Sequence, residues 1–195
     1  MIYIDIQHIG KPNKPDDMGA GFGDDPWETE AYWTTLYAFH MEMRLRELGY
    51  SVMRLCDGRY SDRHERVNRY EADYPSSKPS VYIACHINAG GGSYSVMFHD
   101  HRSSLGPDLA AAIADEMDLP GISTTKTLPA SPSDWTSNAY NTIKDVRRPV
   151  SICAEPLFLD NENHRREYLE LDRIFLIGEA IANGIHSWYT QQENT

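Results

Sequence analysis

Four side chains of this 195-residue sequence could carry out a reaction together, namely His8, Glu30, His86 and Glu155. Two imidazoles and one carboxylate are the ligand set of a catalytic Zn²⁺ site, which leaves the fourth position to water. A second carboxylate beside that water could act as its base or polarising group in metal-assisted hydrolysis. Because these residues lie far apart in the sequence, this chemistry depends on the elements that carry them.

Three of the four side chains end stretches that are typical of buried β-strands. These stretches are residues 2–8, 80–88 and 150–155. Each is rich in β-branched or apolar residues and bounded by glycine or proline, as strands are. The carboxyl ends of parallel strands share one edge of a sheet, where α/β proteins place their ligands. We therefore expect His8, His86 and Glu155 to converge.

Glu30 stands at the start of a predicted helix that Gly49 ends. Apolar residues recur there at helical spacing, namely Trp33, Tyr37, Met41, Leu45 and Leu48. Glu30 precedes Trp33 by three positions and so lies on the core-facing side of the helix. A carboxylate in that place is expected to have a role beyond that of a solvated charge.

Composition narrows the classes of function. The net charge of −11 argues against nucleic acid and anionic membranes as partners, because phosphate contacts need lysine and arginine. No apolar run approaches the roughly 20 residues of a membrane span. The first residues lack the features of a signal peptide. We expect a monomeric, single α/β domain over residues 1–195, made in the cytoplasm without a visible signal peptide.

Other reactive side chains have simpler interpretations. Cys56, Cys85 and Cys153 are an odd number without zinc-knuckle spacing, so we expect free thiols in the core. A cysteine hydrolase would need a thiolate activated by a nearby histidine, whereas core strands usually raise the pKa of a thiol. The triplet His99-Asp100-His101 looks like a metal site but is more typical of a solvated turn.

Two long segments show no sustained helical or strand periodicity of apolar residues. Residues 11–27 are rich in proline and glycine and predict a loop, and loops of that length are usually functional or disordered. Residues 119–148 predict an ordered excursion over the site. Trp27, Trp135 and Tyr140 could line a glycan or peptide groove, although loop aromatic residues pack on their own framework at least as often.

Four ordered motifs spanning nearly the whole chain resemble the type 3 N-acetylmuramoyl-L-alanine amidases. These zinc enzymes cleave the amide between the lactyl group of N-acetylmuramic acid and the first L-alanine of peptidoglycan. The motifs are Ile2-Tyr3-Ile4-Asp5 running to His8, Glu30 with Gly49-Tyr50, Cys85-His86-Ile87-Asn88, and Ala154-Glu155 followed by Phe158 and Asn161. Arg66 matches an arginine of the helix before the second histidine.

The resemblance implies a fold, a cofactor and a role for each residue. It implies a mostly parallel, six-stranded twisted sheet with helices on both faces. His8, Glu30 and His86 would bind Zn²⁺, and Glu155 would be the catalytic carboxylate. The substrate would be peptidoglycan or a muropeptide, and the site of action the cell wall. A short chain without a visible export signal favours a bare catalytic domain of the phage-type lysin (endolysin) kind.

The sequence also departs from the family pattern. Gln7 and Ile9 stand where glycines usually flank the first histidine, and the first loop is longer than usual. The longer loop makes Glu28 a competing ligand, but the helical phase and the spacing to Gly49-Tyr50 favour Glu30. Two other functions stay open: an inactive, amidase-like module that binds muropeptide, and a zinc carboxypeptidase. Inactive versions are expected to lack Glu155.

Overall fold

Six strands form one sheet in the order β2-β1-β3-β6-β4-β5. The structure is a computed structural model that describes residues 1–132 and 136–193. The strands are β1 (Ile2–Ile6), β2 (Val52–Leu55), β3 (Val81–Cys85), β4 (Ser95–Asp100), β5 (Thr125–Ala130) and β6 (Val150–Glu155). Neighbouring strands are parallel except β4 and β6, which are antiparallel. The prediction of a mostly parallel six-stranded sheet is confirmed.

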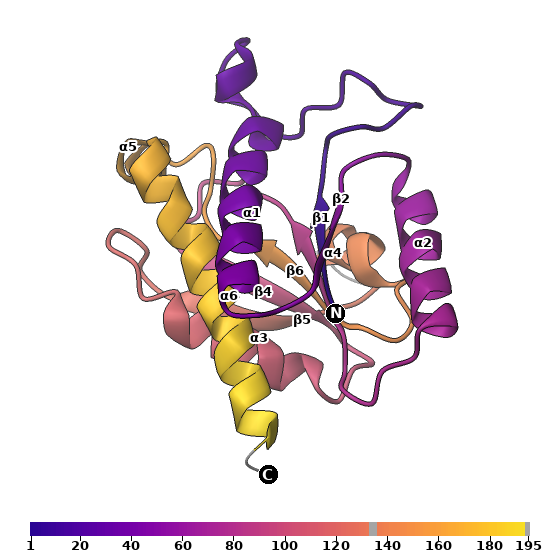
Figure 1. Cartoon of the computed structure of the whole chain (residues 1–195). Helices are drawn as coiled ribbons and strands as arrows, with labels where there is room; N and C mark the ends of the chain where they lie inside the picture. Colours follow the sequence, from indigo (N-terminus) through magenta and orange to yellow (C-terminus); the bar gives the residue numbers. More distant parts are fainter. Residues whose placement is uncertain (133–135, 194–195) are drawn as a thin grey trace.

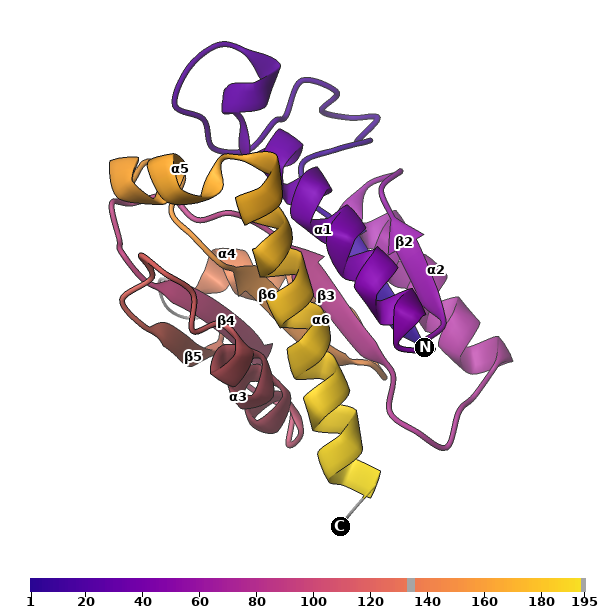
Figure 2. The same cartoon turned by 60° about the vertical axis from the view of Figure 1, so that its left-hand side comes forward.

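Helices cover both faces of the sheet, as predicted (Figures 1 and 2). The helices are η1 (Pro26–Glu28), α1 (Glu30–Glu47), α2 (Tyr60–Asp73), α3 (Gly106–Glu116), α4 (Ser137–Ile143), α5 (Glu162–Tyr168) and α6 (Leu171–Glu193). One core packs α1, α3 and α6 on the sheet, with α6 in contact with both of the others. A second core packs α2 and α4 on the opposite face. No helix among the described residues is long and apolar enough to cross a membrane.

Strand β1 shows why the sheet has two cores. Successive side chains of a strand point to opposite faces. Ile2, Ile4 and Ile6 therefore enter the core under α1 and α6, while Tyr3 enters the core under α2 and α4. Both faces of β1 are covered and all five of its residues are buried, as in the central strands of α/β proteins.

Helices α1 and α6 approach each other closely at Gly178. A Cβ atom added to Gly178 would lie 2.3 Å from the backbone oxygen of Tyr37 and 2.8 Å from the backbone nitrogen of Met41. Only glycine leaves room for this contact between backbones. The contact matters to the site because α1 carries Glu30 at its first position.

The segment 119–148, predicted to be an ordered excursion without a sustained period, contains β5 and α4. Helix α4 does reach the candidate site, because Asn138 and Thr142 line the same pocket as His86 and Glu155. Trp135 lies outside the described residues, so its predicted place in a substrate groove stays a prediction.

Candidate active site

The parallel register aligns the ends of three strands at one edge of the sheet. Ile6 of β1 pairs with Cys85 of β3, and Cys85 pairs with Ala154 of β6. His8 follows β1 by two residues, His86 follows β3 directly, and Glu155 is the last residue of β6. The first turn of α1 brings Glu30 to the same edge. The structure therefore brings together all four side chains that the sequence singled out.

His8, Glu30 and His86 have the spacing of a three-ligand metal site. Nε2 of His8 lies 3.3 Å from Nδ1 of His86 and 3.4 Å from Oε1 of Glu30, and Nδ1 of His86 lies 2.9 Å from the same oxygen. Tetrahedral ligands about 2.0–2.1 Å from Zn²⁺ would be about 3.4 Å from one another. The three atoms thus fit a zinc ion with little movement. No other group of three such side chains in the described part of the chain is close enough to hold a metal.

Backbone groups hold Glu30 toward the histidines. Oε1 of Glu30 accepts a hydrogen bond from the amide of Ile87 at 3.0 Å, and Oε2 accepts one from the amide of Ala20 at 2.9 Å. Gly19, at φ +75°, leaves room for this carboxylate, since a Cβ there would lie 2.4 Å from Oε2. Burial alone would raise the pKa of Glu30, but its hydrogen bonds with the histidines and their charges place that pKa well below its usual value. Glu30 is therefore an anion at neutral pH.

The competing candidate, Glu28, has a different role. It ends η1, and its Oε2 accepts a hydrogen bond from the amide of Asp25 at 2.9 Å. Glu28 therefore helps to cap η1, while Glu30 stands beside His8 and His86. The geometry favours Glu30 as the ligand, in line with the helical phase of the sequence.

The turn at His8 is unusual. His8 has φ of 60°, a left-handed conformation that costs free energy in a residue other than glycine. Its amide donates a hydrogen bond to the hydroxyl oxygen of Tyr60 at 3.2 Å. The departure at Gln7 and Ile9 is thus accommodated by His8 itself, whose backbone the neighbouring groups hold in this conformation.

Arg63 supports the same turn from beneath and was not recognised in the sequence. Its buried guanidinium pairs with Asp5 at 2.6 Å, donates to the carbonyl oxygen of Ile6 at 2.7 Å, and also donates to that of Ile9. Arg66, which matches an arginine of the family, is a surface residue paired with Asp57 at 2.9 Å. The arginine that holds the site lies three positions earlier on α2.

Asp17 orients His8 and was also missed in the sequence. Its Oδ1 lies 3.0 Å from Nδ1 of His8, which leaves Nε2 of His8 facing Glu30 and His86. The other carboxylate oxygen of Asp17 pairs with Lys11, whose ammonium also donates to Tyr60 at 3.0 Å. Burial would raise the pKa of Asp17, but hydrogen bonds from Lys11 and His8 hold it well below its usual value. A carboxylate behind a metal-binding histidine is typical of zinc sites.

His86 is fixed through its backbone. Its amide donates to the carbonyl oxygen of Ala154 at 2.9 Å, and its own carbonyl oxygen accepts a hydrogen bond from the hydroxyl of Tyr37 at 2.9 Å. These bonds join the residue after β3 to β6 and to α1. The imidazole is therefore carried by the rigid part of the fold.

Glu155 shares a pocket of about 480 Å³ with the three ligand candidates. Burial, aided by the charge of Glu30 and opposed by that of His86, raises the pKa of Glu155 to about 7. A carboxyl group that titrates near neutral pH can accept a proton in one step and return it in another. Glu155 thus has both the position and the acidity of a proton-transfer group.

The remaining candidates do not form a second reactive centre. All three cysteines are free, and burial raises the pKa of the Cys85 and Cys153 thiols, so neither is an activated nucleophile. The expectation of a solvated turn at His99-Asp100-His101 is wrong for its first two residues, which are buried at the end of β4. Strand β4 pairs with β6 in an antiparallel arrangement, which the polar residue types alone did not predict.

The fold is that of N-acetylmuramoyl-L-alanine amidase catalytic domains, as the resemblance implied. The amidase AmiC2 of Nostoc punctiforme matches with a TM-score of 0.72 and 18% identity, over 97% of this chain and 96% of that chain. The CwlD amidase of Clostridioides difficile, solved in complex with the GerS lipoprotein, matches with a TM-score of 0.70 and 17% identity, over 97% and 98% of the two chains. The catalytic domain of the CD27L endolysin, which targets Clostridia difficile, matches with a TM-score of 0.66 and 18% identity, over 95% and 96%.

No protein-family model matches the chain, and no curated protein sequence matches it. At these low identities the structural matches establish the fold alone.

Proposed function

We propose that the protein is a zinc-dependent N-acetylmuramoyl-L-alanine amidase, which hydrolyses the amide between N-acetylmuramic acid and L-alanine in peptidoglycan. One observation carries the proposal. The candidate ligand atoms of His8, Glu30 and His86 lie 2.9–3.4 Å apart at the carboxyl edge of the sheet. Glu155 lines the same pocket. Solved amidases and an endolysin domain of the same fold support this substrate class.

His8, Glu30 and His86 would hold the metal. Their donor set of two imidazole nitrogens and one carboxylate oxygen suits Zn²⁺, and Asp17 and the Ile87 amide already orient two of these ligands. Zinc in this place would supply Lewis-acid polarisation of the amide carbonyl and stabilise the negative charge that develops on its oxygen.

Glu155 would move the protons of the reaction. As a carboxylate it takes a proton from the attacking water, and it then passes that proton to the amine of L-alanine as the amide bond breaks. In the metal-free protein, burial raises the pKa of Glu155 to about 7, which favours a group that both accepts and returns a proton. Asn138 and Thr142 of α4 line the same pocket and could contact the substrate.

We further propose that residues 1–195 act as one catalytic domain on the cell wall, as a phage-type lysin does. The catalytic domain of the CD27L endolysin has the same fold over 95% of this chain, which supports such a role.

The decisive test is incubation of purified, zinc-loaded protein with muropeptides, followed by mass spectrometry of the products. A new amine terminus at L-alanine, with intact lactyl-bearing muramic acid, is the expected result. Release of a C-terminal amino acid would identify a carboxypeptidase instead. Binding of muropeptide without any cleavage would identify an inactive recognition module.

A further inference from the structure

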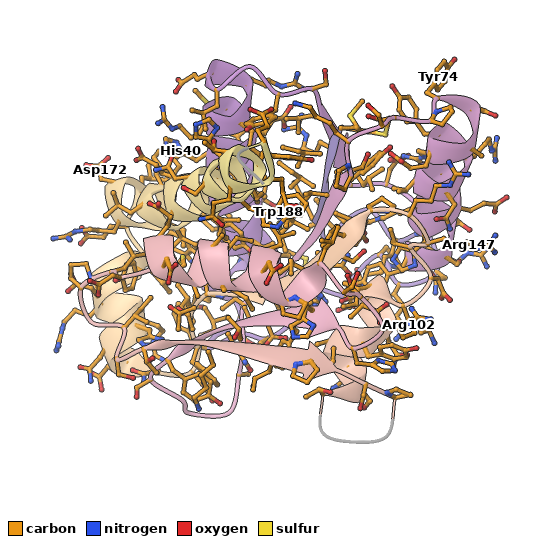
Figure 3. The ribbon with its side chains drawn as sticks, turned by 90° about the horizontal axis from the view of Figure 1, so that it is seen from below. His40, Tyr74, Arg102, Arg147, Asp172 and Trp188 are labelled. Carbon is orange, nitrogen blue, oxygen red and sulfur yellow. The ribbon has the colours of Figure 1, made fainter. Side chains whose placement is uncertain are left out.

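A second polar pocket lies at the edge of the sheet opposite the candidate active site. It has a volume of about 440 Å³ and is lined by the start of β6, the end of β4, the loop before α3 and the loop after α4. Strands β1, β3 and β6 begin at this edge and end at the edge that carries the candidate ligands. Figure 3 views the molecule from below and shows Arg102 and Arg147 on the same side of it. We call this site the basic pocket.

Four cationic side chains line the basic pocket, namely Arg102, Lys144, Arg147 and Arg148. The whole chain has 18 basic and 29 acidic residues and a net charge of −11. A cluster of four cations therefore has the opposite sign to the net charge of the chain. The one acidic side chain in the lining is Asp100, which is 7% exposed and already paired with Arg102. The lining therefore carries a net positive charge.

Three of these cations have no counter-ion among the residues that the structure describes. Within residues 1–132 and 136–193, the side chains of Lys144, Arg147 and Arg148 form no ion pair, whereas Arg102 is paired with Asp100. Like charges that share one pocket repel one another unless an anion balances them. Glu65 and Asp145 lie with Arg147 in a neighbouring pocket, but no carboxylate among the described residues forms an ion pair with Lys144, Arg147 or Arg148.

Backbone contacts fix the frame of the basic pocket. The guanidinium of Arg102 donates to the carbonyl oxygen of Lys144 at 2.7 Å, which joins the end of β4 to the loop after α4. Nη1 of Arg148 donates to the carbonyl oxygen of Glu71 at 3.0 Å, which joins that loop to α2. The cations are thus carried by segments that already hold one another in place.

The donor chemistry is that of a phosphate site. Guanidinium groups bind phosphate oxygens through two parallel hydrogen bonds, and lysine adds a compact positive charge. Ser103 also lines the pocket, and its oxygen accepts the amide of Gly106 at 2.9 Å, so its hydroxyl hydrogen can be donated to a ligand.

We propose that the basic pocket binds a phosphate group, either as the free anion or within an anionic phosphodiester polymer. The proposal is independent of hydrolysis at the candidate active site. Only the polymer source rests on the proposed function, because such polymers accompany peptidoglycan in many walls. Binding would then hold the molecule at the wall by the edge that faces away from the reaction.

The test is titration of the whole protein with inorganic phosphate by calorimetry, at constant ionic strength maintained with potassium chloride. We expect saturable binding that weakens at least about tenfold in a Lys144→Gln/Arg147→Gln variant, since charged hydrogen bonds are lost. The matched control, Arg44→Gln/Arg173→Gln, removes the same charge from α1 and α6 and should bind as the parent does. Thermal melting confirms that each variant is folded.

A second arm distinguishes the two sources. Poly(glycerol phosphate), compared with inorganic phosphate at equal phosphorus concentration, should bind more tightly if the polymer is the ligand and equally if the free anion is. Either result supports the proposed phosphate site if the double variant loses the binding. Absence of saturable binding, or equal binding by parent, double variant and control, overturns the proposal. Amidase activity on muropeptides is measured separately, so failure of one proposal does not obscure the other.

Discussion

At the scale of the residue, the two histidines carry the first prediction. His8→Ala and His86→Ala should lose zinc or bind it far more weakly, because three protein ligands are the minimum for a stable catalytic site. Metal analysis of purified protein, with about one zinc per parent chain expected, measures this directly. His40→Ala is a suitable control, since His40 stacks on Phe175 away from the site. Full zinc occupancy in His86→Ala would show that the ligand assignment is wrong.

Glu155→Gln separates catalysis from metal binding. If Glu155 transfers protons, the nearly isosteric variant should keep zinc and fold but lose about 10²–10⁴ in kcat. Metal content, Tm and kcat have to be measured on one preparation. A kcat within about threefold of the parent at full zinc occupancy would exclude the proposed role. Loss of zinc would instead place Glu155 among the ligands.

Glu155 should also make the stability of the metal-free protein depend on pH. Its pKa is raised from 4.5 to about 7 by burial, so the folded state holds the proton more strongly than the unfolded state does. The resulting stabilisation is complete below about pH 4.5 and is lost as the pH rises through about 7. A shift of this size corresponds to about 3 kcal/mol.

The measurement is the difference in Tm between metal-free Glu155→Gln and the metal-free parent from pH 4 to pH 8. The Tm of the variant should rise relative to that of the parent as the pH rises, and the difference should be largest above pH 7. Glu170→Gln, at an exposed position, is the control. A difference that does not change with pH would contradict the buried, protonatable state of Glu155.

The sequence identified side chains that follow regular elements and missed those that depend on loops. His8, His86 and Glu155 follow β-branched runs, so their common edge could be inferred before any coordinates. Asp17 lies in an irregular loop, and nothing in its neighbourhood in the sequence indicates that it contacts His8. On α2, charged residues recur so densely that the sequence did not distinguish buried Arg63 from exposed Arg66.

At the scale of the element, the contact between α1 and α6 gives a test of packing. Gly178→Ala should destabilise the protein by at least about 1 kcal/mol, because the clash with the Tyr37 backbone outweighs the higher helix propensity of alanine. Chemical denaturation of parent and variant measures the change. Gln192→Ala, at an exposed position of the same helix, should lie within about 0.5 kcal/mol of the parent. Equal stability of Gly178→Ala would mean that the helices can separate without cost.

Elements were predictable where burial gave them a pattern. Helix α1 and strands β1, β3 and β6 have apolar runs or stripes that face a core, and the sequence located all of them. Strand β5 lies at the end of the sheet, is largely exposed and contains Pro129, so neither alternation nor an apolar run indicates it. Its presence was implied only by the family resemblance. Helix α4 has seven residues, too few to show a helical period.

At the scale of the whole molecule, the ligand candidates come from three elements. His8 follows β1, Glu30 begins α1 and His86 follows β3, so one ion would connect two strands and a helix. A ligand that binds only the folded state stabilises it by RT ln(1 + [L]/Kd), about 2.7 kcal/mol when its free concentration is 100 times Kd. Removing zinc should therefore lower the stability of the entire fold and not only abolish activity.

We expect the Tm of the parent to fall on dialysis against a chelator and to recover when zinc is added back. The fall should be absent in His86→Ala, which lacks a ligand from the start, whereas Glu155→Gln should respond as the parent does because it keeps all three ligands. This pattern distinguishes metal removal from a direct effect of the chelator, which would act on every variant alike. An unchanged Tm in the parent, with metal loss verified by analysis, would contradict the prediction, because it would mean that zinc binds the folded state no more tightly than the unfolded state.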